Sequence, residues 1–128
     1  MENREGLIWF DGEFVDWKDA NIHILNHGLH YASSVFEGER SYSGKIFKVR
    51  EHTERLFESA RALDLKITYS VEEIIDASYK AIELNNVTDA YLRPIVLRGT
   101  EMGVSAPNAK GHVAVRVGEW LSACTTAE

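Results

Sequence analysis

The sequence predicts an α+β domain whose mostly antiparallel sheet is covered on one side by two helices. The apolar residues alternate with the period of strands near both ends of the chain, and they recur at helical spacing in its middle. Turn-forming pairs such as Asp11-Gly12 and Ser43-Gly44 separate neighbouring strand patterns, which favours hairpins. The expected order is therefore hairpin, strand pair, two helices and strand pair.

Six strands are expected, rich in β-branched and aromatic residues and bounded by turn signals. They are Leu7–Phe10, Glu13–Val15, Ser33–Tyr42, Lys45–Val49, Ala90–Arg98 and His112–Val117. The segment Trp17–Leu25 is expected to be irregular or a short strand. Gly99, Gly103, Gly111 and Pro107 mark the loop between the last two strands.

Two amphipathic helices are expected in the middle of the chain. The first begins after Arg50 and runs to about Leu65, and its buried stripe is Leu56, Phe57, Ala60 and Leu63. The second is predicted to begin at Ser70, because Ser70 and Glu73 have the spacing of a capping box. Its buried face is Ile74, Ala77, Ala81 and Ile82, and Asn85-Asn86 is a plausible stop.

Composition is that of one soluble globular domain: 128 residues, 45% hydrophobic and 27% charged. A net charge of −6 argues against nucleic acid as a partner, because proteins neutralise its phosphates with Lys and Arg. The single Cys124 rules out an internal disulfide and is compatible with a reducing compartment. Neither a signal peptide nor a membrane span is expected, so the sequence indicates a cytoplasmic protein.

Alternation places Phe36, Gly38 and Arg40, together with Ser34 and Tyr42, on one strand face, and Val35, Glu37 and Glu39 on the other. A glycine in mid-strand weakens the strand, and it often marks a close approach to the backbone. Beside Phe36, Gly38 could leave a slot for a planar or aliphatic ligand group. A bulge or bend is an equally good interpretation.

Tyr91 and Arg93 also share a strand face, and a phenol beside a guanidinium is well suited to gripping a carboxylate. The alternative is that both lie in water at a sheet edge, which the following Pro94 would permit. Arg55, at the border of the first helix's apolar stripe, could hold an anion such as a phosphate. It could equally pair with Glu51 or Glu58 on the helix surface.

A metal site is not expected. His23, His27 and His30 would share one face of a helix, but Gly28 and Asn26 argue against a helix there. No acidic residue or cysteine completes a known zinc pattern.

Several segments occur in the order found in branched-chain amino acid aminotransferases, pyridoxal-phosphate enzymes of fold type IV, which the chain resembles over about residues 7 to 118. These segments are IWFDGEFV, HGLHYASSVFEGERSY, REHTERLFESA, AYLRP and EMGVSAPN. The resemblance implies the small N-terminal domain of a homo-oligomeric enzyme that exchanges an amino group between Leu, Ile or Val and 2-oxoglutarate. A D-amino acid aminotransferase or an aminodeoxychorismate lyase is a weaker alternative.

The resemblance also implies roles for individual residues. Arg55 matches the arginine that binds the phosphate of pyridoxal 5′-phosphate. Phe36 and Gly38 match residues that line the side-chain pocket. Tyr91 matches the tyrosine that assists binding of the α-carboxylate. The distal carboxylate of glutamate is expected at Tyr31 and Arg93, and Val104 matches a residue that closes the pocket, often that of the neighbouring subunit.

One part of the family pattern is missing from this sequence. None of its six lysines matches the motif around the Schiff-base lysine, which family members carry in a second, larger domain. Residues 119–128 form an atypical tail, so truncation, proteolysis and a shifted reading frame stay open as explanations. We expect this chain alone not to transaminate. The competing expectation is a non-catalytic module that binds a carboxylate or phosphate, or that dimerises.

Overall fold

The computed structural model describes residues 5–101, 103–105 and 110–119. Pro107, Cys124 and all of the expected tail except Glu119 lie outside the described residues. The described elements are β1 (Leu7–Phe10), β2 (Glu13–Asp16), the 3₁₀ helix η1 (Trp17–Asp19), α1 (His27–Tyr31), β3 (Ser34–Phe36), β4 (Glu39–Tyr42), β5 (Lys45–Ile46), α2 (Val49–Ala62), α3 (Val71–Leu84), β6 (Ala90–Leu97) and β7 (His112–Glu119).

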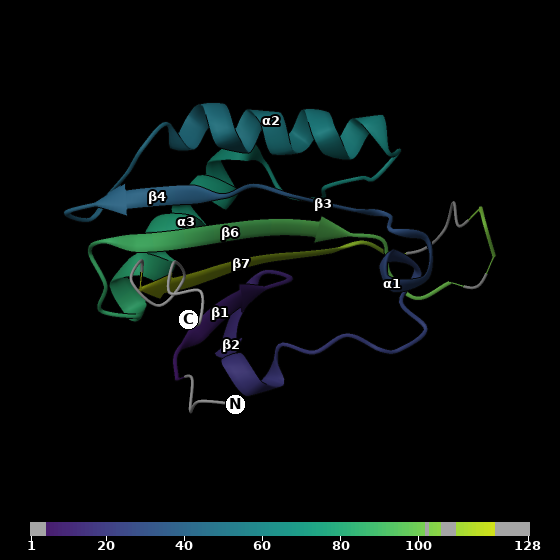
Figure 1. Ribbon diagram of the computed structural model, residues 1–128, viewed down its shortest axis with the longest axis horizontal. Helices are drawn as coiled ribbons and strands as arrows, with labels where there is room; N and C mark the ends of the chain where they lie inside the picture. Colours follow the sequence, from purple (N-terminus) through teal and green to yellow (C-terminus); the bar gives the residue numbers. More distant parts are fainter. Residues whose placement is uncertain (1–4, 102, 106–109, 120–128) are drawn as a thin grey trace, which may run out of the picture.

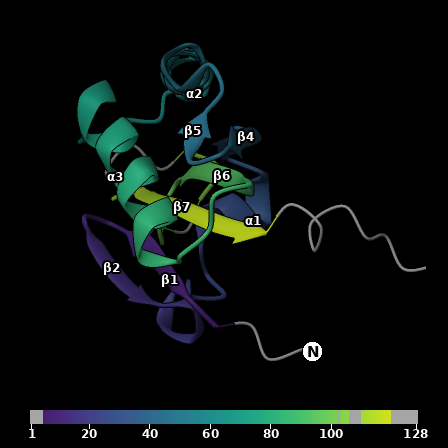
Figure 2. The ribbon, with the colours of Figure 1, turned by 90° about the vertical axis from the view of Figure 1, so that its left-hand side faces the viewer.

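The strands form one antiparallel sheet in the order β2-β1-β7-β6-β4-β5, and β3 also pairs with β6 (Figure 1). Helices α2 and α3 lie on the same side of β6 and β7, as Figure 2 shows. The predicted α+β fold, with two helices over one side of an antiparallel sheet, is confirmed. We call the opposite side of the sheet its open face.

The core fills the space between the sheet and these two helices. Each helix contributes apolar side chains from the predicted stripe, such as Leu56 from α2 and Ile74 from α3, and both are fully buried. They pack with Trp9 of β1, Val96 of β6 and Val115 of β7. Burial of this apolar surface is the main free energy that holds the helices on the sheet.

Two residues of the predicted stripe are less buried than expected, and Phe57 is partly buried against the core. Leu63 is exposed, because α2 ends one residue earlier, at Ala62. The helix is therefore shorter at its C-terminal end than its apolar pattern indicates.

The segment expected to be one strand, Ser33–Tyr42, is two strands with a gap at Glu37 and Gly38. The register is the same on both sides of the gap, since Phe36 pairs with Ile95 and Glu39 with Leu92. No residue is inserted, so the bulge interpretation of Gly38 is wrong.

Proline explains the gap. Glu37 N donates to Pro94 O at 3.0 Å, but Pro94 has no N–H to complete the pair. Pro94 is buried in β6, which has β7 on one side and β3 with β4 on the other. The expectation of an edge strand at Pro94 is therefore wrong, and β6 tolerates the proline as an interior strand.

The segment that begins at His27 is a short helix, contrary to the sequence interpretation. Asn26 caps it, because its side chain accepts from Gly28 N at 2.9 Å, and Ala32 ends it in the left-handed region. Glycine suits residue 28 of this helix because a Cβ there would lie only 2.9 Å from the capping oxygen, Asn26 Oδ1. Within the described ranges, no helix is both long and apolar enough to cross a bilayer.

Candidate functional site

Four of the predicted site residues come together on the open face: Phe36, Gly38, Tyr91 and Arg93, which we call the open-face cluster. They belong to β6 and to the strand segment that pairs with it, and the register on either side of Gly38 places it opposite Arg93. Alternation along β6 turns Tyr91 and Arg93 to this face while Leu92 is buried under the helices. Phe36 is 56% exposed, so the cluster is open to a ligand or to another protein surface.

The phenol of Tyr91 lies close to the backbone of Gly38. A Cβ built on Gly38 would lie 3.0 Å from Tyr91 Oη and 3.4 Å from Cε2 of the same ring. A side chain at residue 38 would require the phenol to shift by a few tenths of an ångström. The slot expected beside Phe36 is therefore the place where the Tyr91 ring lies.

Arg93 is held in place by two aromatic neighbours. Its Nε donates to Tyr91 Oη at 3.0 Å, and its Nη2 also donates to that oxygen. Its guanidinium lies 4.2 Å from the centre of the Phe36 ring, a cation–π arrangement. The predicted pairing of Tyr91 with Arg93 is therefore present, although neither residue lies on an edge strand.

Arg55 lies across the strand from this cluster. From α2 its Nε and Nη2 donate to the two carboxylate oxygens of Glu37, each at 2.7 Å. His52 Nδ1 lies 2.8 Å from Glu37 Oε2. The Arg55 guanidinium, with a smaller contribution from His52, holds the pKa of the Glu37 carboxyl below its usual range against the opposing effect of burial. The partners that the sequence suggested for Arg55, Glu51 and Glu58, are the wrong ones.

Tyr31 and Val104 lie together, apart from the open-face cluster. Both line a hollow of about 470 Å³ beside α1, and Val104 is 83% exposed. The Tyr31 ring is in contact with His27 at 4.5 Å between centroids. Tyr31 lines this hollow, whereas Arg93 belongs to the open-face cluster.

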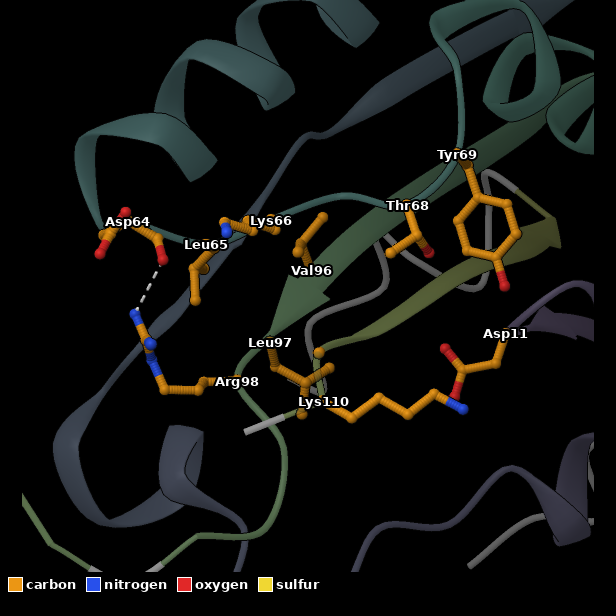
Figure 3. A pocket seen from close by; sticks show the side chains of 11 residues that line it. Asp11, Asp64, Leu65, Lys66, Thr68, Tyr69, Val96, Leu97, Arg98 and Lys110 are labelled. Carbon is orange, nitrogen blue, oxygen red and sulfur yellow. Dashed lines mark hydrogen bonds between the residues drawn. The ribbon is translucent and has the colours of Figure 1, made fainter. Parts of the chain in front are cut away.

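A separate hollow of about 390 Å³ lies between the α2–α3 connection and the end of β6 (Figure 3). Its polar groups serve the fold. Arg98 donates to the carbonyl oxygens of Leu63 and Asp64 at 2.8 and 3.2 Å, which satisfies the C-terminal end of α2. Asp11 accepts from Val113 N at 2.9 Å. This hollow shares no residue with the predicted site.

The histidines expected not to bind metal make bonds within the fold. His27 Nδ1 lies 2.6 Å from Ser33 Oγ and its Nε2 2.9 Å from Gly103 O, while His30 Nε2 lies 2.9 Å from Ile24 O. No group of three or more potential metal ligands is present among the residues that the structure describes.

Sequence reasoning missed Glu37 as a site residue. Alternation predicted that Glu37 faces away from Phe36 and Gly38, but its partners on α2 are 15 and 18 residues away in the chain. A buried carboxylate needs a cationic partner, and Arg55 at the border of the apolar stripe was the signal that could have pointed to it.

Residues 34–124, more than half of the chain, match the family model described as "Amino-transferase class IV". The chain belongs to this family. The matched residues of this class IV aminotransferase chain include the whole open-face cluster and the Glu37–Arg55 pair.

The class IV chain is also similar to curated and solved relatives. It is 45% identical over 125 residues to the branched-chain-amino-acid aminotransferase of Pseudomonas aeruginosa, covering 94% of this chain and 41% of the relative. It superposes with a TM-score of 0.87 at 38% identity on the solved Escherichia coli branched-chain amino acid aminotransferase, covering 91% of this chain and 40% of the other.

A solved T.th. branched-chain amino acid aminotransferase, complexed with N-(5′-phosphopyridoxyl)-L-glutamate, gives the same TM-score of 0.87 at 36% identity. There the match covers 92% of this chain and 42% of the other. The chain thus spans about two fifths of the length of the relatives that it matches.

Proposed function

We propose that this chain is the N-terminal part of a branched-chain aminotransferase, which transfers an amino group between Leu, Ile or Val and 2-oxoglutarate by means of pyridoxal 5′-phosphate. The open-face cluster is the observation that carries the proposal. It combines an apolar ring with a positioned arginine and phenol, the groups needed to bind an amino acid with an aliphatic side chain and a carboxylate. A cytoplasmic location and a homo-oligomeric state belong to the same proposal.

The residues present fit the phosphate group of that cofactor. Arg55 uses Nε and Nη2 for Glu37, while its Nη1 has no hydrogen bond within the described part of the chain and its side chain is 63% exposed. An arginine guanidinium has two edges with paired donors, Nε–Nη2 and Nη1–Nη2, so the second, outer edge of Arg55 suits a phosphate, although its Nη2 also lies 3.4 Å from His52 Nδ1. When bound, the cofactor would supply an electron-withdrawing ring that stabilises negative charge developing at the substrate Cα.

Substrate recognition would be divided over the open face. Tyr91 and Arg93 would bind carboxylate oxygens, and Phe36 would pack against the aliphatic side chain. Tyr31 and Val104 lie in a different hollow of the same copy. We therefore assign their proposed roles, with the distal carboxylate and in closing the pocket, to the site of a second copy.

We propose that the reactive amine is not among the residues of this site. All six lysines lie within the described ranges, and none belongs to the open-face cluster or contacts Glu37 or Arg55. We propose that residues 1–118 form the small domain, that residues 119–128 are atypical, and that the lysine comes from a larger domain. The chain alone would then bind ligands without turnover.

A coupled leucine/2-oxoglutarate assay tests this function. The 128-residue chain alone should give no more turnover than free pyridoxal 5′-phosphate. Residues 1–118 fused in place of the matching segment of the Escherichia coli relative should restore glutamate formation, because that enzyme supplies the remaining domain. Turnover by the chain alone, or a folded fusion that is inactive with all three branched-chain substrates, would contradict the proposal.

A non-catalytic binding module is the second candidate. It is favoured by one observation: Arg55 and Arg93 both retain donors without any contribution from a further domain. Titrating pyridoxal 5′-phosphate into the 128-residue chain separates the candidates. A tight 1:1 complex that Arg55→Ala abolishes, together with an inactive fusion, would support the binding module.

A further inference from the structure

We propose that Glu37 is a positioning residue for Arg55, which it orients so that the outer edge of the guanidinium faces an incoming phosphate. The inference rests on the proposed function, since that function supplies the phosphate. It adds to the site a residue that the sequence motifs did not single out.

The contrast in burial between the two partners is the first argument. Glu37 is 4% exposed, whereas the Arg55 side chain is 63% exposed. A long arginine side chain in water samples many rotamers, and fixing it before a ligand arrives lowers the entropy lost on binding. The buried carboxylate is the fixed point, and the exposed guanidinium is the group that is being fixed.

The geometry of the pair decides which edge of Arg55 stays available. Both oxygens of Glu37 accept from the Nε–Nη2 edge at 2.7 Å, which is bidentate and allows little rotation of the guanidinium plane. The Nη1 side is therefore turned away from the strand. A single hydrogen bond would leave the plane free to rotate, and it would not select an edge.

Glu37 is itself fixed from two directions. Its backbone N donates to Pro94 O at 3.0 Å, which keeps it in register with β6. His52, one turn before Arg55 on α2, lies 2.8 Å from Oε2 of the carboxylate. The carboxylate thus cannot swing out to follow Arg55, so Arg55 must conform to it.

The place of Glu37 in the chain links two ends of the proposed site. Its neighbours Phe36 and Gly38 belong to the open-face cluster, while its own side chain points to the helix-covered face. One strand segment therefore sets both the side-chain pocket and the direction of Arg55. A change at residue 37 should act on the phosphate end without removing any residue of the open-face cluster.

The test compares pyridoxal 5′-phosphate with pyridoxal, which lacks the phosphate, on the fusion enzyme described above. Glu37→Gln should weaken binding of pyridoxal 5′-phosphate by about tenfold, because a neutral amide holds only one edge donor of Arg55. Binding of pyridoxal should change by less than about twofold, since Glu37 acts only through the phosphate contact. Absorbance of the bound ligand gives both affinities without measuring turnover. Glu58→Gln, an exposed carboxylate on the same helix, is the matched control.

A double-mutant cycle completes the test. Once Arg55→Gln has removed the guanidinium, adding Glu37→Gln should cost no further affinity for pyridoxal 5′-phosphate. On the 128-residue chain, the Arg55 Nε–H signal in nuclear magnetic resonance should be protected from exchange in wild type and lost in Glu37→Gln.

Each unfavourable result has a distinct meaning. Unchanged affinity in Glu37→Gln, equal weakening of pyridoxal and pyridoxal 5′-phosphate, or additive losses in the cycle would each overturn the role of Glu37. A wild-type fusion that binds neither ligand would instead overturn the proposed function.

Discussion

Glu39 places a carboxyl group inside the domain with no hydrogen-bond partner for either of its oxygens among the described residues. The residue is 1% exposed on the helix-covered side of the sheet. Burial, with a smaller contribution from the nearby Glu37 carboxylate, raises the pKa of Glu39 from about 4.5 to about 8. The two neighbouring glutamates thus differ in charge at neutral pH, because Arg55 pairs with Glu37 alone.

The raised pKa of Glu39 predicts a pH-dependent free energy of unfolding. Between about pH 4.5 and 8 the folded chain keeps a proton that the unfolded chain has released. The contribution of Glu39 to the free energy of unfolding is therefore fully present below the pKa of the unfolded chain. It is lost as the pH rises toward 8, by at most about 1.4 kcal/mol per pH unit. Urea unfolding of wild type and Glu39→Met at pH 5 and pH 8 measures this loss.

Glu39→Met keeps the length of the side chain without a titrating group, so it should unfold at higher urea than wild type at pH 8. This difference in urea midpoint should be smaller at pH 5, because there the wild-type chain has lost less of the stability that depends on protonated Glu39. Taking the difference between the two proteins cancels the titration of the histidines. An advantage of the same size at both pH values would contradict the raised pKa.

Elements whose signals are local could be predicted from the sequence, and elements that depend on distant partners could not. The Ser70 capping box and the buried face of α3 were predicted because each lies within a few consecutive residues. The gap between β3 and β4 depends on Pro94, more than fifty residues further along the chain. Helix α1 was missed because asparagine and glycine, here Asn26 and Gly28, are both typical of turns, whereas Asn26 serves here as the helix cap.

The Ser70–Glu73 capping box is expected to stabilise the start of α3. Ser70 Oγ accepts from Glu73 N at 3.1 Å, and Ser70 N donates to Glu73 Oε2 at 2.7 Å. Ser70→Ala removes the first bond and should lower the free energy of unfolding by about 1 kcal/mol, whereas Ser70→Asp should lie within a few tenths of wild type. Equal urea midpoints for Ser70→Ala and wild type would show that packing alone determines where α3 begins.

Across the whole molecule, the two faces of the sheet have different partners. Helices α2 and α3 cover one face (Figure 2), and the open face carries the exposed ring of Phe36 beside Arg93. Alternation predicted which residues share the open face, so the open-face cluster could be proposed from the sequence. The position of Tyr31 could not, because it depends on how α1 packs at the end of the sheet.

An open face with exposed aromatic rings predicts reversible self-association of the 128-residue chain. Phe36 is 56% exposed beside Arg93, and apolar surface of this kind favours contact with another protein surface. Phe36→Ser should weaken the association by on the order of tenfold, because burial of a phenyl ring contributes about 1.5–3 kcal/mol. Sedimentation equilibrium over a range of concentrations measures the dissociation constant.

Tyr79→Ser, an exposed ring on the outer face of α3, is the control and should associate as wild type does. If the two variants weaken association equally, the contact is not specific to the open face; if wild type sediments as a monomer at all concentrations, the open face does not hold two copies together.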